Sequence, residues 1–69
     1  MKLEPIKLRR LRAGFIDREE VANLLGISES YLGKLERGDK TPSPKLIVRM
    51  AKLYRCTTDE IFKDFNITG

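Results

Sequence analysis

The 69 residues suffice for one domain near the lower size limit for independent folding, because so short a chain buries only about 60% of its unfolded surface. Fourteen basic and ten acidic side chains leave a net charge of +4, which favours an anionic partner. With no histidine, one cysteine and no glycine-rich phosphate loop, the chain lacks a zinc ligand set and most routes to catalysis. We therefore expect no enzyme, no metal and no cofactor.

The composition also bears on location. No apolar run approaches the roughly 20 residues that a bilayer span needs, and charged residues interrupt the apolar ones in residues 1–10, unlike a signal peptide. We expect a cytoplasmic protein that does not contact membranes. Cys56 is interpreted as a small, half-buried apolar filler.

The first predicted helix covers residues 5–13. Pro5 suits its first turn, and Gly14 ends it. Its apolar side is assigned to Leu8 and Leu11, with Ile6 as a further option.

The second predicted helix covers residues 18–25. Asp17 is expected to cap it, and Glu20, three residues on, would close a capping box. Ile16 and Val21 have the spacing of a hydrophobic staple.

The third predicted helix covers residues 29–37 and follows after a tight turn. Gly26 supplies the positive φ that ends the preceding helix, and Ser28 caps the new one. Ile27 and Leu32 repeat the staple spacing. Two short helices joined in this way are typical of a motif that presents its second helix to the major groove of DNA.

Two more helices complete the pattern, and no strand signal competes with them. Ser43 is the expected cap of a helix over 44–54, and Thr57 with Glu60 forms a capping box for a helix over 58–65. The predicted core consists of apolar residues at helical spacing: Val21, Ala22, Leu25, Leu32, Leu35, Leu46, Ile47, Met50, Ala51, Tyr54, with Phe15 and Phe62.

These residues resemble the Cro/C1-type, or XRE-family, helix-turn-helix domain of phage-repressor-like regulators. The resemblance lies in the segment REEVANLLGISESYLGKLERGDKTPSPKLIVRMAKLY and in the CTTDEIF that follows. It implies an all-α, compact five-helix, lambda-repressor-like fold over 1–69, with the helix-turn-helix at 18–25 and 29–37. It further implies a bacterial or phage transcriptional regulator that binds double-stranded DNA, most simply as a repressor.

The resemblance also implies structural roles. Ala22 matches the small residue that lets the two helices cross closely, and Gly26 matches the turn glycine. Glu36 matches an inward glutamate that pairs with an arginine of the first helix. We assign Arg12 as that partner, because it lies four residues after Leu8.

Three departures from the family pattern stand out. Arg18 occupies the position of a usual glutamine, and it adds a charge that glutamine cannot supply. The connection over 13–16 is about one residue shorter than usual, and Arg55 replaces a glycine that often ends the fourth helix.

Four residues are the predicted base readers, because the N-terminal part of the third helix faces the bases in this motif: Glu29, Ser30, Gly33 and Lys34. Lys34 is either a donor to guanine O6 or N7 or a solvated lysine, and Ser30 bonds a base or a phosphate. Glu29 either accepts from cytosine N4 or favours the helix dipole. Gly33 either lets the helix approach the groove or is a tolerated surface glycine.

Phosphate contacts are assigned to the surrounding polar residues: Arg18, Ser28, Arg37, Lys40 and Thr41. One such domain covers too little DNA for tight specific binding, so we expect a homodimer, at least on DNA, on a pseudo-palindrome with half-sites about 34 Å apart. The expected contact comprises Ile61, Phe62, Phe65 and Ile67. An alternative is a protein-interaction module of the same fold, such as an antitoxin. No small-molecule ligand is evident.

Overall fold

The computed structural model describes residues 4–65, which form five helices and, within that range, no strand. The helices are α1 (Pro5–Arg12), α2 (Arg18–Leu25), α3 (Glu29–Arg37), α4 (Pro44–Tyr54) and α5 (Thr58–Asp64). The predicted bounds of α2, α3 and α4 are confirmed, and α1 and α5 each end one residue earlier than predicted. The all-α fold class is confirmed.

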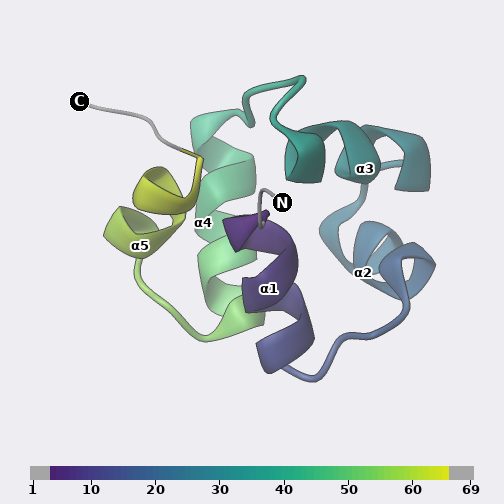
Figure 1. The fold of residues 1–69 in the computed structure, drawn as a ribbon, viewed down its shortest axis with the longest axis horizontal. Coiled ribbons are helices and arrows are strands. Elements are labelled where there is room, and N and C mark those ends of the chain that lie inside the picture. Colours follow the sequence, from purple (N-terminus) through teal and green to yellow (C-terminus); the bar gives the residue numbers. More distant parts are fainter. Residues whose placement is uncertain (1–3, 66–69) are drawn as a thin grey trace.

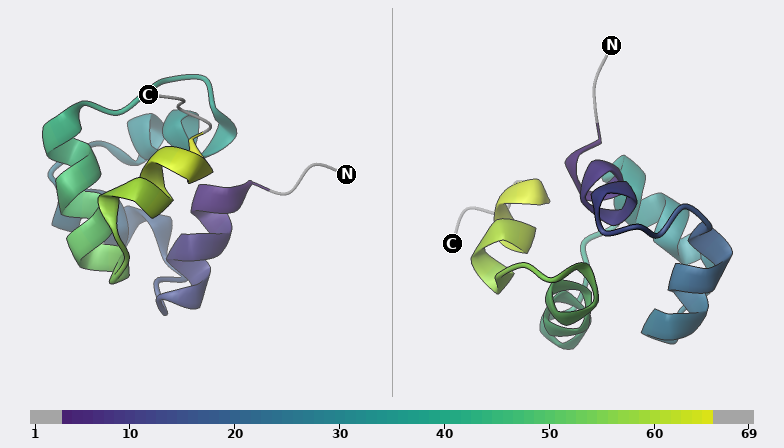
Figure 2. Two further views of the ribbon diagram at one scale, coloured as in Figure 1. Left: turned by 90° about the vertical axis from the view of Figure 1, so that its left-hand side faces the viewer. Right: turned by 90° about the horizontal axis from the view of Figure 1, so that it is seen from below.

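The helices pack as two pairs with a fifth helix between them. α2 packs mainly on α3, and α4 mainly on α5, while α1 contacts both α3 and α5 (Figure 1). The further views in Figure 2 agree that α1 lies between the α2–α3 pair and α5. α4 also contacts α2, so α1 and α4 cover the inner side of the α2–α3 pair, and no other helix of residues 4–65 covers its outer side. No helix of the described residues is long and apolar enough to span a bilayer.

The N-terminal caps form largely as predicted. The hydroxyl groups that accept a hydrogen bond from their helix are those of Ser28, Ser43 and Thr57. Thr57 and Glu60 complete the predicted capping box. Asp17 caps α2 through the N–H of Glu19, so the capping box predicted with Glu20 is wrong.

The start of α2 differs from prediction in a second way. Ile16 is 81% exposed, so the staple predicted between Ile16 and Val21 does not form. The backbone carbonyl of Ile16 instead accepts a hydrogen bond from the Arg10 guanidinium, which fixes the chain entry to α2 without the Ile16 side chain.

The core is built from one apolar face of each helix. The residues predicted from α2, α3 and α4 are all buried, and Phe15 and Phe62 are partly buried against them. The apolar side predicted for α1 is wrong for Leu11, which is 38% exposed, and Leu8 is only half-buried; Ile6, the further option, is buried, and so is Arg10. Burying Ile6 also turns residue 10 inward, because residues four apart share one face of a helix.

Candidate nucleic-acid interface

The turn between α2 and α3 sets the angle at which the two helices cross. Gly26 has φ +74°, which a residue with a side chain adopts only at a cost, and the Ile27 N–H donates to the Ala22 carbonyl across the turn. Ser28 then accepts a hydrogen bond from the Tyr31 N–H at 3.0 Å and starts α3. Ala22 is buried at the crossing, where its small side chain permits close packing.

A buried ion pair fixes α3 against α1. Arg10 Nε donates to Glu36 Oε2 at 2.7 Å, and both side chains are buried. The predicted pair between Arg12 and Glu36 is therefore wrong, and Arg12 is exposed. The reason is the orientation of α1: the helix buries Ile6, so the inward arginine is the one four residues after Ile6.

Arg10 also organises the segment before α2. Its Nη1 donates to the carbonyl oxygens of Phe15 at 2.7 Å and Ile16 at 3.0 Å. The guanidinium thus connects α1, the α1–α2 connection and α3 at one point.

Burial raises the pKa of the neighbouring Tyr54 hydroxyl well above its usual value, and the Glu36 carboxylate adds to the rise.

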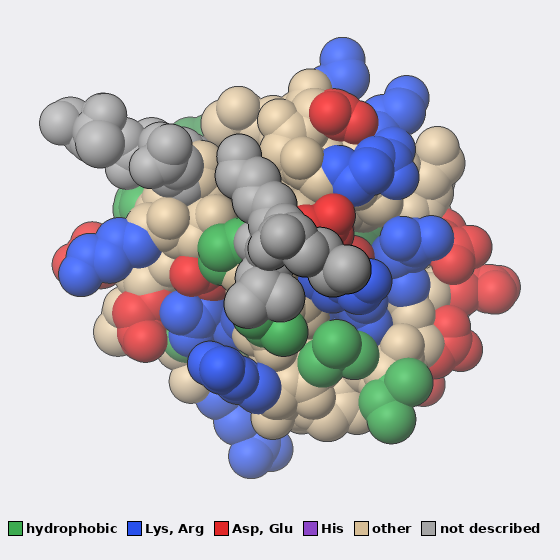
Figure 3. All heavy atoms as spheres, viewed as in Figure 1, with side chains coloured by type: hydrophobic (Ala, Val, Ile, Leu, Met, Phe, Trp, Pro, Cys, Tyr) green, Lys and Arg blue, Asp and Glu red, His purple; other side chains and the backbone are tan. Residues whose placement is uncertain are grey.

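The outer face of α3 carries the predicted base readers. Glu29, Ser30 and Lys34 are exposed, as are the predicted phosphate contacts Ser28, Arg37, Lys40 and Thr41. Figure 3 shows Lys and Arg side chains gathered over α3 and the loop after it, whereas Asp and Glu side chains gather at the edge formed by α2. The exposed acidic residues at the start of α2 are Asp17, Glu19 and Glu20. The charge of this surface is therefore divided between the two helices.

Gly33 and Arg18 differ from the other members of this surface. Gly33 is buried although it belongs to the row of outward residues, and Arg18 is half-buried. Arg18 Nε lies 3.7 Å from Glu29 Oε2, an ion pair between the start of α2 and the start of α3. On the other side, Arg37 pairs with Asp39 at 3.2 Å.

The predicted dimer contact is only partly available at the surface. Ile61 is 0% exposed, so its assignment to a subunit contact is wrong: it lies in the core, on the helix that packs on α4. Phe62 and Phe65 are half-buried against the core, and Ile67 lies outside the described residues.

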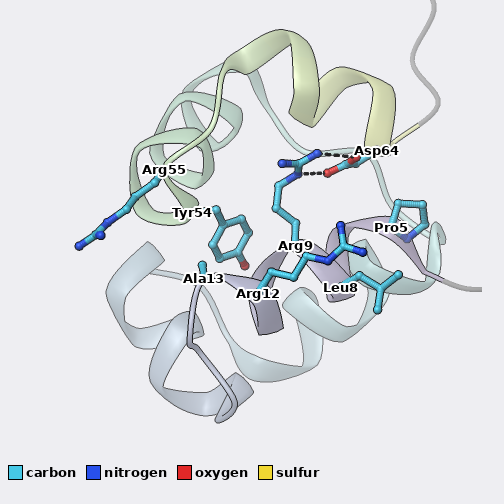
Figure 4. A pocket seen from close by; sticks show the side chains of 8 residues that line it. All are labelled: Pro5, Leu8, Arg9, Arg12, Ala13, Tyr54, Arg55 and Asp64. Carbon is cyan, nitrogen blue, oxygen red and sulfur yellow. Dashed lines mark hydrogen bonds and ion pairs between the residues drawn. The ribbon is translucent and has the colours of Figure 1, made fainter.

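The contact between α1 and α5, away from the α3 surface, contains ion pairs that the sequence did not indicate. Arg9 of α1 makes two hydrogen bonds to the Asp64 carboxylate of α5, and its Nη1 lies 3.6 Å from Glu60 Oε2. Arg9 and Asp64 line a cavity of about 360 Å³ between α1, α4 and α5, where Arg9 points to Asp64 and Arg55 points away (Figure 4). Arg55, at the departure from the family pattern, has φ +58° and ends α4.

Cys56, after the end of α4, is half-buried. Burial raises the pKa of the Cys56 thiol, which disfavours the reactive thiolate. Within residues 4–65, no three His, Cys, Asp or Glu side chains group together as metal ligands would.

The fold and the α2–α3 motif agree with comparisons to known proteins. A family model described as helix-turn-helix matches residues 6–61, so the chain belongs to this family, the Cro/C1-type helix-turn-helix proteins. An uncharacterized HTH-type transcriptional regulator, YazB of Bacillus subtilis, is 40% identical over 58 residues, which cover 77% of this chain and 83% of the relative. No solved structure matches the chain significantly.

Proposed function

We propose that this protein is a sequence-specific, double-stranded-DNA-binding transcriptional regulator that inserts α3 into the major groove and acts as a repressor in the cytoplasm. The observation that carries the proposal is the outer face of α3: it is polar and cationic, begins with a capped turn, and is held by a buried ion pair. Membership of the helix-turn-helix family and the name of the relative support DNA binding and regulation.

The base readers would be the exposed side chains at the start and middle of α3. Lys34 would donate to a guanine edge, and Ser30 would bond a base or a phosphate. Arg37, Lys40 and Thr41 would contact phosphates on the side where α3 ends. The Ser28 hydroxyl already accepts from Tyr31, so Ser28 would contact phosphate as a donor.

Two copies of the domain would bind a pseudo-palindromic operator, with half-sites about 34 Å apart. Phe62 and Phe65, the half-buried aromatic residues of the α5 end, remain the proposed subunit contact together with Ile67. A repressor of this kind acts by occupying a promoter.

A selection of bound sequences from a random DNA pool tests the proposal directly. We expect a recurring half-site, present twice with two-fold symmetry, and affinity for random duplex that falls steeply with salt. Lys34→Ala should weaken binding to the selected operator much more than the matched change Lys45→Ala, since Lys45 is an exposed residue of α4. Arg37→Ala should weaken binding to all duplexes and make the salt dependence shallower by about one unit of log slope.

Two results would contradict the proposal. A pool that yields no enriched sequence would contradict the proposed sequence specificity of binding. An absence of salt-dependent binding to any duplex would remove DNA as the partner and favour the protein-interaction module.

A further inference from the structure

Gly33 lies under two arginine side chains that reach it from different parts of the helix-turn-helix. A Cβ placed on Gly33 would be 3.4 Å from Nη1 of Arg18 and 3.4 Å from Nη1 of Arg37. Arg18 belongs to the first turn of α2, and Arg37 to the last turn of α3. The two guanidinium groups therefore meet over one turn of the helix, and this explains why an outward position is buried.

With no side chain at position 33, Arg18 lies directly against the α3 backbone. The Arg18 Cζ is 3.6 Å from the same Cβ position, so the centre of the guanidinium, and not merely its tip, is seated there. Glycine is unfavourable in a helix interior, so the chain forgoes helix propensity at this position. A methyl group at this position would lie in van der Waals contact with both guanidinium groups, 3.4 Å from each Nη1, so it would shift the flexible end of Arg18 only slightly.

Glu29 lies next to the Nε edge of the Arg18 guanidinium. Its Oε2 lies 3.7 Å from Arg18 Nε, and Nε is buried without a hydrogen-bond partner among the described residues. The inner edge of the guanidinium thus faces Glu29, while part of the side chain remains exposed. A carboxylate in this position orients a cation beside it.

We propose that Arg18 reads a guanine, with Gly33 as its seat and Glu29 as its positioning residue. The inference rests on the proposed function, because it requires α3 in the major groove. Guanine presents the O6 and N7 acceptors side by side there, and a guanidinium fork matches both at once. Lysine carries the same charge without the fork. This assignment moves Arg18 from a phosphate contact to a base contact and makes Glu29 a partner of Arg18 instead of a cytosine reader.

The first experiment compares Arg18→Lys with the wild type on the selected operator by fluorescence anisotropy. We expect the variant to lose about 5- to 150-fold in affinity for the operator, the range of one bidentate base contact. It should retain affinity for random duplex within about two-fold, because the charge is kept. Arg12→Lys is the matched control, since Arg12 is exposed on α1, and it should change neither affinity.

Replacing the guanine by 7-deazaguanine, which lacks N7, identifies the atom that is read. The wild type should lose affinity for the altered operator, and Arg18→Lys should lose much less. An equal loss in both proteins would overturn the assignment of Arg18 to that base.

Gly33→Ala tests the seat. Alanine should raise the melting temperature, because it favours the helix, and should weaken operator binding less than Arg18→Lys does, because the methyl group shifts the Arg18 guanidinium only slightly and keeps its fork. In the Arg18→Lys background, Gly33→Ala should have almost no further effect. An equal loss in both backgrounds would show that Gly33 serves the approach of α3 to the groove and would overturn its role as a seat.

The outcomes separate this inference from the proposed function. A wild-type protein without preference for any duplex contradicts the proposed function. A wild-type protein that prefers its operator, with no effect of Arg18→Lys or 7-deazaguanine, leaves the proposed function intact and overturns the guanine assignment alone.

Discussion

Two arginine–glutamate pairs connect α3 to a neighbouring helix, one to α1 and the other to α2, in very different surroundings. Arg10 and Glu36 are 2.7 Å apart, with side chains 4% and 1% exposed. Arg18 and Glu29 are 3.7 Å apart, with side chains 41% and 48% exposed. The residue types are identical, so any difference in their contribution comes from burial and geometry.

The difference decides how much each pair contributes to the stability of the fold. A buried charge that loses its partner is left without water or a counter-ion, and this costs several kcal/mol. A pair in water contributes only about 0–1 kcal/mol, because solvent and salt screen it. Loss of the Arg18–Glu29 pair therefore costs little stability, whereas loss of the Arg10–Glu36 pair costs much more.

The largest loss of stability is expected for Arg10→Ala. It leaves Glu36 buried and unpaired and removes the donor to the Phe15 and Ile16 carbonyls, so the free energy of unfolding should fall by about 3–5 kcal/mol. Urea unfolding followed by circular dichroism measures this loss. Arg12→Ala is the control and should stay within about 0.5 kcal/mol of the wild type. Equal stability of the two variants would contradict the structural role of Arg10.

The Arg9–Asp64 pair is intermediate in burial, so its contribution to stability should be intermediate too. Arg9 and Asp64 are 26% and 11% exposed, and Asp64 raises the pKa of the Arg9 guanidinium further above its usual value. Asp64→Asn should cost about 1 kcal/mol in the same urea experiment, since water partly screens the pair. Asp39→Asn, in the exposed pair with Arg37, should cost less than half as much. The reverse order would show that burial does not rank these pairs.

The capping box of α5 supplies a pH-dependent case. Hydrogen bonds from the Thr57 N–H and hydroxyl lower the pKa of Glu60 below its ordinary value near 4.3. A lowered folded-state pKa means that this contribution to stability is present above about pH 4.3 and is lost as the pH falls through the folded-state value. Glu60→Gln keeps an acceptor but does not titrate. The wild type should therefore lose melting temperature relative to Glu60→Gln below about pH 4. A difference that stays constant with pH would contradict the shift.

The smallest effect on stability is expected at Glu29. Glu29→Gln should leave the free energy of unfolding within about 0.5 kcal/mol of the wild type, because Arg18 Nε and Glu29 Oε2 are 3.7 Å apart and the two side chains are 41% and 48% exposed. The same variant should discriminate less well against operators that lack the guanine. A stability loss above about 1 kcal/mol would place Arg18–Glu29 with the structural pairs and remove the contrast.

The parts of this structure that local sequence signals determine could be predicted. The caps Ser28, Ser43 and Thr57 act within three residues of their own position, so their hydrogen bonds follow from the sequence. The orientation of α1 could not be predicted in this way. Ile6, Leu8 and Leu11 lie among basic residues in a helix of eight residues, and its apolar pattern admits more than one inward face.

Contacts between residues far apart in the sequence could not be predicted for a different reason. Arg9 and Asp64 are 55 residues apart, and nothing local to either one indicates the other. The predicted Arg12 partner of Glu36 failed because it depended on Leu8 facing inward. The contact of Arg18 with Gly33 required both the crossing angle of α2 and α3 and the size of one missing side chain.

The inward bonds of Arg10 have a consequence for engineering new specificities. They position α3 through Glu36 and the chain before α2, and within residues 4–65 no hydrogen bond from the side chain of Ser30 or Lys34 supports the fold. A library randomised at these two positions should consist mainly of folded members. Such a library would let operator preference be rewritten by selection while the framework stays constant.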